Sequence, residues 1–267
     1  MLKFIDSHAH LTDSKYDNIR ESLINSLLSD GIKSVFTVAY DDISSKECVN
    51  LAQKYENIYA IIGVHPDEVK CYNAETERML LNLAKEPKVL AIGEIGLDYH
   101  NIPSNADIEK TKELQKQVFI KQLEIAHKSS LPVVIHTRDS LNDVLLILEE
   151  HKNVLQNGGV IHCFLDKFED YQRIKKLGFK ISVGGILTFK NAKSLQETIK
   201  LIDIQDIILE TDCPYLTPEP FRGKVINEPK YTLYVASKLS ELKNISIDKI
   251  SEITNKNVQD VFKKYKG

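Results

Sequence analysis

The sequence predicts one α/β domain over residues 1–267, folded as a (β/α)8 barrel of the TIM type with an additional C-terminal helix. Short apolar runs rich in β-branched residues alternate with longer amphipathic segments from one end of the chain to the other. Eight such units fit into roughly 250 residues, which is the number and size typical of this barrel. We find no linker, low-complexity tract or change in composition that would divide the chain. A doubly wound open sheet is the structural alternative.

The expected strands are apolar along both faces, as in a parallel sheet that other elements cover on each side. In chain order they occupy residues 2–6, 32–39, 58–64, 89–95, 132–137, 159–164, 179–184 and 206–212.

The segments between the strands have the apolar spacing of helices. In the segment 139–150, Leu141, Val144, Leu145 and Leu148 recur at helical spacing, and Asp139 is a candidate N-cap. Two connections that follow strands, 99–111 and 213–229, are long enough to be functional loops. We expect the other helices over about 15–30, 43–55, 74–86, 111–129, 166–177, 191–202 and, last, about 246–265, where the helix packs on the barrel.

Composition and charge are ordinary for a globular protein, with 42% hydrophobic residues, 27% charged residues and a net charge of −3. No general positive field would attract nucleic acid, so any recognition of phosphate must be local. The four cysteines lack CxxC spacing, which predicts reduced thiols and neither a disulfide framework nor a cysteine-based zinc site. We expect Cys163 and Cys213 to be small buried hydrophobes. No signal-peptide pattern or membrane-spanning run occurs, so we expect a cytoplasmic protein without membrane contact.

Polar side chains follow the apolar runs of six expected strands. Alternation along a strand places Asp6, His8 and His10 on one face, and two imidazoles there could hold a metal ion or form a polar rim. The carboxyl ends of barrel strands converge on one axis, so residues far apart in sequence become neighbours. The residues at these ends are His8 and His10, then His65, Glu94, His136, His162 and Asp212.

The motifs around these residues resemble one known family. The stretches DSHAHL, GVHP, GEIGLDY, VVIHTRD, GVIHCF and ETDCPYLTP, in this order, resemble the TatD family of metal-dependent deoxyribonucleases, within the amidohydrolase-like group of barrels. The resemblance spans Phe4 to about Pro229 and implies a (β/α)8 fold with a site for two divalent metal ions. It implies that His8, His10 and Asp212 bind the first ion, that Glu94 bridges both, and that His136 and His162 complete the second.

The identity of the metal stays open between Mg²⁺, Mn²⁺ and Zn²⁺. Mixed nitrogen and oxygen donors suit Zn²⁺, Mn²⁺ or Fe²⁺ better than Mg²⁺. The nucleases of the family that the motifs resemble, however, are commonly described as magnesium-dependent. A divalent ion lowers the pKa of bound water from about 15.7 to roughly 7, on the order of 12 kcal/mol of differential stabilisation. We therefore expect the metals to carry the chemistry, with Asp212 as proton acceptor and Glu94 as bridging ligand.

Other residues are candidates for contact with substrate. We expect His65 to contact a phosphate and Glu210 to support the ligands. Arg138, two residues beyond His136, could contact a phosphate or form a structural salt bridge. Arg222 and Asn227 resemble the family's P-x-RG…N-x-P segment, which implies that they grip substrate.

The leading functional hypothesis is a deoxyribonuclease of the exonuclease type, with single-stranded DNA or nucleic-acid ends as substrate. The alternative is a metal-dependent ester or amide hydrolase, such as a deacylase acting on mischarged aminoacyl-tRNA. A third class is a non-catalytic protein that binds metal or nucleic acid. We expect a monomer without an obligate protein partner.

Overall fold

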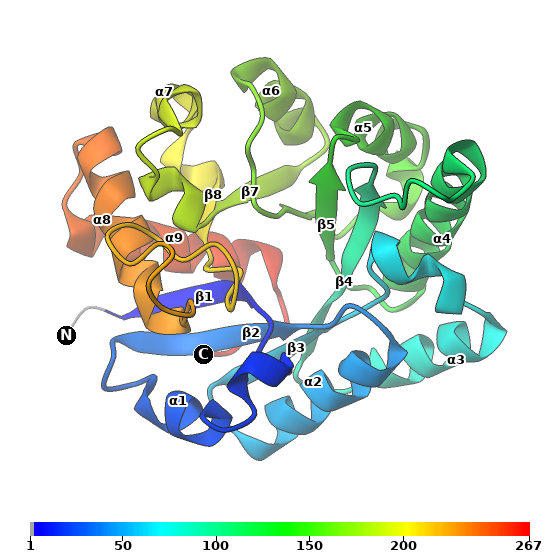
Figure 1. The fold of residues 1–267 in the computed structure, drawn as a ribbon, viewed down its shortest axis with the longest axis horizontal. Helices are drawn as coiled ribbons and strands as arrows, with labels where there is room; N and C mark the ends of the chain where they lie inside the picture. The colour runs from blue at the N-terminus through cyan, green and yellow to red at the C-terminus, as the bar shows by residue number, and fades with distance from the viewer. Residues whose placement is uncertain (1–2) are drawn as a thin grey trace.

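The computed structural model describes residues 3–267 and is a (β/α)8 barrel. Every strand pairs in parallel with the next one along the chain, so the order in the sheet is the order in the sequence. In Figure 1 the helices surround the strands. The strands are β1 (Phe4–Ala9), β2 (Ile32–Val38), β3 (Ile58–Ile62), β4 (Val89–Asp98), β5 (Val133–Arg138), β6 (Gly159–Ile161), β7 (Phe179–Val183) and β8 (Ile207–Leu209).

The connections are mostly amphipathic helices that bury one side against the strands. The α-helices are α1 (Arg20–Ser26), α2 (Asp42–Lys54), α3 (Ala74–Leu83), α4 (Ile108–Lys128), α5 (Leu141–Glu150), α6 (Phe168–Lys176), α7 (Lys193–Leu201), α8 (Thr232–Lys243) and α9 (Ile247–Val261). Short 3-10 helices are η1 (Ser14–Tyr16), η2 (Pro66–Cys71), η3 (Lys152–Val154), η4 (Gly185–Thr188), η5 (Ile204–Asp206) and η6 (Pro229–Tyr231).

The two ends of the sheet meet just beyond β8. Ala9 forms an isolated bridge with Cys213, the amide of Asp212 donates to the carbonyl of His8 at 2.9 Å, and the amide of His10 donates to the carbonyl of Cys213 at 2.7 Å. The closure of the barrel therefore brings residues from opposite ends of the sequence into register.

The C-terminal segment packs at the amino-terminal ends of the strands. A cluster of buried side chains combines residues from seven strands with residues of α9 and the segment after it. Phe36 of β2 lies 5.1 Å from Phe262 and 5.2 Å from Tyr265 between ring centroids, and the Tyr265 hydroxyl lies 2.9 Å from Ser34 Oγ. This packing confirms the predicted C-terminal helix and leaves the carboxyl ends of the strands for the site.

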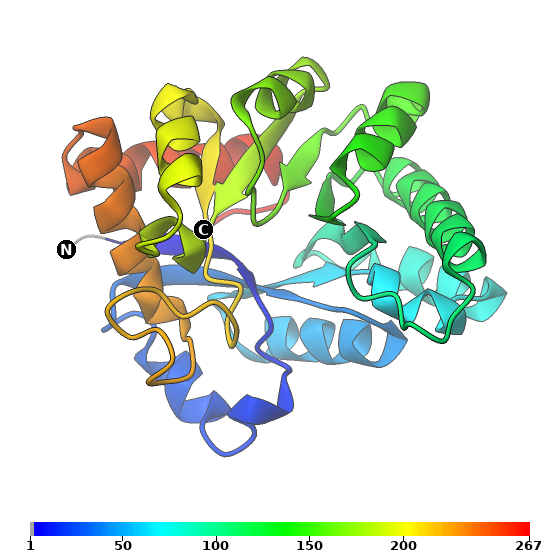
Figure 2. The same cartoon turned by 45° about the horizontal axis from the view of Figure 1, so that its top comes forward.

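The long loop after β8 crosses back to the start of the chain. In Figures 1 and 2 this loop, which precedes α8, lies beside the segment that leads from β1 to α1. Tyr16 donates a hydrogen bond to the carbonyl of Asn227, and the hydroxyl of Tyr215 donates to Asp13 at 2.8 Å.

Several predicted boundaries are corrected. The helix expected over 15–30 is split, because η1 and a turn precede α1. The predicted strand over 2–6 begins at Leu2, outside the described residues, and β1 extends to Ala9. The strand expected to end at residue 95 continues to Asp98, so Glu94 lies in the interior of β4 and not at its end.

Two local predictions are also wrong. Ser140, not Asp139, is the N-cap of α5, and Asp139 accepts a hydrogen bond from His100. No helix was expected over α8, where exposed Leu233 and Tyr234 obscure the helical pattern of the buried positions. None of the described helices combines the length and hydropathy that a membrane crossing requires.

Candidate metal centre

The predicted ligands meet at the carboxyl-terminal mouth of the barrel, around the side chain of Glu94. Five strands or the residues just after them contribute, and most of these side chains are buried. The residues are His8 and His10 at the end of β1, Glu94 in β4, His136 in β5, His162 after β6 and Asp212 after β8.

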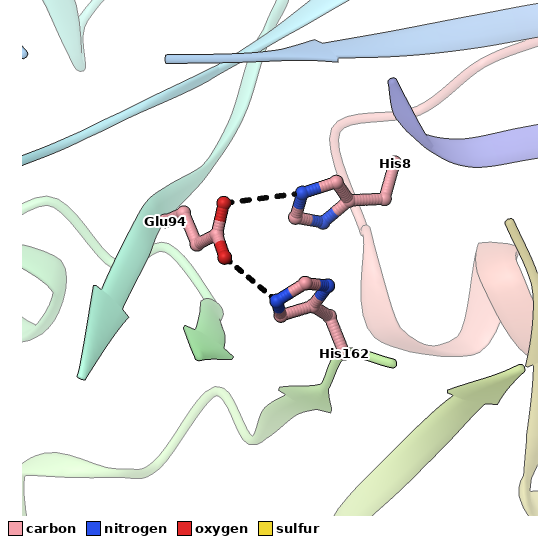
Figure 3. A group of neighbouring side chains, drawn as sticks. All are labelled: His8, Glu94 and His162. Atoms are coloured by element: carbon pink, nitrogen blue, oxygen red, sulfur yellow. Dashed lines mark ion pairs between the residues drawn. The ribbon is translucent and has the colours of Figure 1, made fainter. Parts of the chain in front are cut away.

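Each oxygen of Glu94 faces a different set of histidines (Figure 3). Oε1 lies 2.6 Å from His162 Nε2 and 2.7 Å from His136 Nδ1, and those two nitrogens are 3.2 Å apart. Oε2 lies 3.3 Å from His8 Nε2 and 3.7 Å from His10 Nε2. The carboxylate is therefore placed between two pairs of imidazoles.

Asp212 completes the second of these groups. Its Oδ1 lies 3.2 Å from His10 Nε2 and 3.8 Å from His8 Nε2. Because the backbone of Asp212 is hydrogen-bonded to β1, barrel closure itself positions this carboxylate.

Asp6 does not join this group, although the alternation of β1 would place it on the same face. The β1–β2 register shifts between Asp6 and Ala9, and the Asp6 carboxylate accepts hydrogen bonds from the amide and the hydroxyl of Thr211 at 2.9 and 2.6 Å. Asp6 is fully buried and ties β1 to the segment after β8.

In two of the imidazoles, those of His10 and His136, the outer nitrogen is hydrogen-bonded to an acceptor, which leaves the inner nitrogen for a ligand. Nδ1 of His10 donates to the carbonyl of Val38 at 3.0 Å, and Nε2 of His136 donates to Asp98 at 3.1 Å. With the ring proton held on the outer side, the nitrogen that faces Glu94 carries its lone pair inward.

The donor set fits divalent cations. Both ring nitrogens of His8 and Nδ1 of His162 are buried without a hydrogen-bond partner among the described residues. A buried imidazole that faces carboxylates without a hydrogen bond is costly unless it is a ligand. His8, Glu94 and His162 form one group with ligand atoms within 4.8 Å of one another, and His8, His10 and Asp212 form another.

The electrostatics favour the ionised form of both carboxylates. Burial would raise the pKa of Glu94, but His162, His8 and His136 hold it well below its usual value. Burial also acts on Asp212, yet His10 and His8 keep its pKa low. Ionised carboxylates are the form that binds a cation.

Glu210 supports His162 from behind, as predicted. It is fully buried, its Oε1 accepts the amide of Cys163 at 2.8 Å and lies 3.7 Å from His162 Nδ1, and its Oε2 accepts the hydroxyl of Ser182 at 2.5 Å. Burial alone would lower the pKa of His162, but Glu94 and Glu210 raise it well above its ordinary value.

His65 stands next to the ligands and differs from them in its tautomer. Its Nδ1 accepts a hydrogen bond from the amide of Asp67 at 3.1 Å, so the neutral ring carries its proton on Nε2, which lies 3.7 Å from Glu94 Oε1. Burial lowers the pKa of His65 to about 3. His65, Asp98 and His136 are close enough to form a third group, but a protonated Nε2 makes His65 a donor and not a ligand.

The four predicted substrate contacts separate into two pairs. His65 and Arg138 line the pocket above the centre, whereas Arg222 and Asn227 do not. Arg222 lies over the ring of Phe189 at 3.8 Å, a position that does not support its predicted contact. Asn227 is fully buried and its amide donates to the carbonyls of Thr211 and Tyr215, so it braces the loop, and its contact with substrate stays a prediction.

Sequence reasoning missed other residues of the pocket. Asp98 accepts a hydrogen bond from the amide of Asn101 and also orients His136, and its spacing of four from Glu94 in one strand was an available signal. Cys213 is buried as expected, but Cys163 is half-buried and lines the pocket, which corrects that prediction. The pocket has a volume of about 610 Å³, within the range of small-molecule sites.

Comparisons with known proteins agree with this geometry. A family model described as TatD related DNase matches residues 5–263. The metal-dependent hydrolase YabD of Bacillus subtilis is 38% identical over 97% of this chain and 98% of its own length. The metal-dependent hydrolase YcfH of Escherichia coli is 34% identical over 97% of this chain and 95% of its own length.

A solved structure shares the fold throughout. The crystal structure of YjjV, a TatD homologue from Escherichia coli, superposes with a TM-score of 0.89 at 27% sequence identity. The match covers 97% of this chain and 98% of that one.

Proposed function

The chain belongs to the TatD family of metal-dependent hydrolases, and from this premise we propose that it is a deoxyribonuclease that cleaves phosphodiester bonds at the ends of single-stranded DNA. The observation that supports the proposal most is the position of Glu94 between two imidazole pairs, because a carboxylate with both oxygens engaged in this way suits a centre of two cations. Two-cation centres are a recurrent solution to phosphodiester cleavage.

His8, His10 and Asp212 would hold one cation, His136 and His162 the other, and Glu94 both. When bound, divalent ions supply positive charge for the phosphate and lower the pKa of water. Mg²⁺, Mn²⁺ and Zn²⁺ all remain candidates, and the four imidazoles favour the latter two.

Asp212 is the proposed proton acceptor. Its pKa is held low by His10 and His8, so it is ionised at neutral pH, and one edge of its side chain borders the pocket. There it can orient the attacking water and receive its proton.

His65 and Arg138 are the proposed partners of the phosphate. The tautomer of His65 presents an Nε2 proton toward the centre, where it can donate to a phosphoryl oxygen without a change in charge. Arg138 is exposed at the pocket wall and offers a guanidinium that suits bidentate contact with a phosphate.

The test is cleavage of single-stranded DNA labelled at either end by protein stripped of metal and reconstituted separately with Mg²⁺, Mn²⁺ or Zn²⁺. We expect metal-dependent shortening, and the position of the label gives the direction of attack. The His136→Ala variant, purified in parallel, controls for contaminating nucleases. No cleavage by protein that holds its metal would overturn the proposal and favour the ester or amide hydrolase, for example a deacylase of aminoacyl-tRNA.

A further inference from the structure

Two exposed tyrosines stand at the mouth of the pocket that contains the metal centre. Tyr215 is 46% exposed and Tyr40 is 39% exposed, and both line the pocket together with His10 and Asp212. A large aromatic ring exposed at the edge of a polar site is a candidate contact for a ligand.

Tyr215 is held in place at its polar end. Its hydroxyl donates to Asp13 Oδ2 at 2.8 Å, and the other oxygen of Asp13 accepts the amide of Lys15, also at 2.8 Å. The Lys15 ammonium lies 4.2 Å from the centroid of the ring. With the hydroxyl engaged, the ring itself is what Tyr215 presents to the pocket.

The ring is also tied to the metal centre through the backbone. Tyr215 follows the ligand Asp212 by three residues, and its amide donates to the carbonyl of Asp212 at 3.0 Å. The ring centroids of Tyr215 and His10 are 6.1 Å apart with an interplanar angle of 68°. If a phosphate group lies at the metal centre, the nucleotide that carries it can therefore reach the ring of Tyr215.

Tyr40 is fixed by a different part of the fold. Its amide donates to Ser44 Oγ, within the capping box of α2, and its carbonyl accepts the amide of His65 at 2.8 Å. The two tyrosines thus belong to separate loops that border one pocket.

We propose that Tyr215 is a stacking platform for the base of the nucleotide next to the scissile phosphate, with Asp13 and Lys15 as positioning residues. This inference rests on the proposed function and makes nucleic acid, not a simple ester, the substrate class of the site. Base stacking on an aromatic ring accepts every base, because each has a π-face, and a ring already anchored loses little conformational freedom on binding. The basic Lys15 adds attraction for the neighbouring backbone.

The test varies the substrate and the protein together. Wild type, Tyr215→Ala and Tyr215→Phe are assayed on a single-stranded oligonucleotide and on the same oligonucleotide with an abasic tetrahydrofuran unit at the end that is attacked. We expect wild type to lose roughly 10- to 100-fold in kcat/KM on the abasic substrate. Tyr215→Ala should lose about the same factor on the normal substrate and little more on the abasic one.

Tyr215→Phe is the matched control, because it keeps the ring and removes only the hydrogen bond to Asp13. We expect it to stay within about threefold of wild type on the normal substrate. Metal content and melting temperature of all three proteins show whether a loss comes from the fold.

The outcomes separate the two proposals. If wild type cuts both substrates equally, or if the losses from Tyr215→Ala and the abasic unit multiply, the stacking platform is wrong while the nuclease stands. If wild type cuts no nucleic acid with any metal, the proposed function fails and the platform fails with it. Should Tyr215→Ala not fold, equal cleavage of the two substrates by wild type would still overturn the platform.

Discussion

At the scale of single residues, the imidazoles of the centre depend on the acceptors behind them. Val38, Asp98 and Glu210 face the outer ring nitrogens of His10, His136 and His162, so the inner nitrogens point at Glu94. Of these three acceptors only Asp98 lines the pocket, and Val38 accepts through its backbone carbonyl, so Glu210 is the side chain whose substitution leaves the pocket lining unchanged.

We predict that Glu210→Gln lowers metal affinity or activity by roughly 10- to 100-fold, because the amide weakens the charge behind His162 and disturbs its bonds to Cys163 and Ser182. Metal titration by calorimetry and the DNA cleavage assay measure the two effects. Ser182→Ala, which removes the two hydrogen bonds of the hydroxyl to Glu210 and Cys163 but leaves the carboxylate, should show a smaller loss. Equal behaviour of wild type and Glu210→Gln would contradict the orienting role.

For Asp212→Asn we predict a loss of about 100- to 10,000-fold in turnover, since the amide cannot accept a proton. The readout is single-turnover cleavage at saturating metal, with the bound metal measured in the same samples. Full turnover with metal still bound would show that another group accepts the proton.

At the scale of elements, the strand that carries Glu94 depends on a close approach to its neighbour. Gly96 of β4 has φ +142°, and a Cβ there would overlap the carbonyl oxygen of His136 in β5. Any side chain must therefore push apart the two strands that supply Glu94 and His136.

Gly96→Ala is expected to lower the free energy of unfolding by more than about 2 kcal/mol, from backbone strain together with overlap. Urea denaturation followed by circular dichroism measures this. Gly223→Ala is the control: its φ is +72°, but nothing lies within 4 Å of the new Cβ, so only about 1 kcal/mol should be lost. Equal losses in both variants would leave the strand contact without support.

A second element, α6, is fastened to the end of the barrel by Asp206. Its carboxylate accepts the hydroxyl of Tyr171 at 2.6 Å and lies 2.7 Å from Lys175 Nζ, and its side chain is only 15% exposed. Burial would raise the pKa of Asp206, but its bonds to Lys175 and Tyr171 lower it.

The pKa of Asp206 is lower in the folded state than its unfolded value of about 3.9. Its ionised carboxylate therefore stabilises the fold above that pH, and this stabilisation is lost as the pH falls through the lower folded pKa. We predict that Asp206→Asn lowers the free energy of unfolding by on the order of 1 kcal/mol at pH 7. The loss is small because Lys175 is exposed and solvent screens the ion pair. The difference from wild type in denaturant unfolding should shrink below about pH 4. Asp203→Asn is the control: its carboxylate is more exposed and lies 3.9 Å from Lys175, so this variant should lose less stability at either pH. A loss of stability in Asp206→Asn that does not depend on pH would exclude an ionic contribution.

Elements with a strong periodic pattern could be predicted from sequence, and those placed by tertiary contacts could not. All eight strands were expected because each is an apolar run, and the polar residues after them were expected to be neighbours because strand ends converge. Their assignment as metal ligands came from the resemblance to a family. The helix α8 was missed because its exposed face carries Leu233 and Tyr234. The bracing role of Asn227 could not be predicted, because a polar residue in a loop gives no sign that its amide will be buried against backbone carbonyls.

At the scale of the whole molecule, charge is nearly balanced, with 35 basic and 38 acidic residues. Such a molecule has no general field that attracts DNA. Under the proposed function, attraction for phosphate would come from bound cations, with Arg138 at the pocket wall and Lys15 over the ring of Tyr215. This arrangement suits binding of a few nucleotides at the end of a strand better than binding along a long single strand.

The cations should also matter for the stability of the whole barrel, because the ligands come from strands spread around its circumference. An ion that binds only the folded state adds about 2.7 kcal/mol at a hundredfold excess over its dissociation constant. For a domain of this size we therefore predict that the stripped protein melts roughly 5–10 °C higher once one ion is restored, and higher again with a second. Calorimetry of stripped and reconstituted protein at matched ionic strength measures it. Glu94→Gln, which contacts both ligand groups, should abolish most of the rise, and an unchanged rise in that variant would mean that the ions stabilise the barrel from another site.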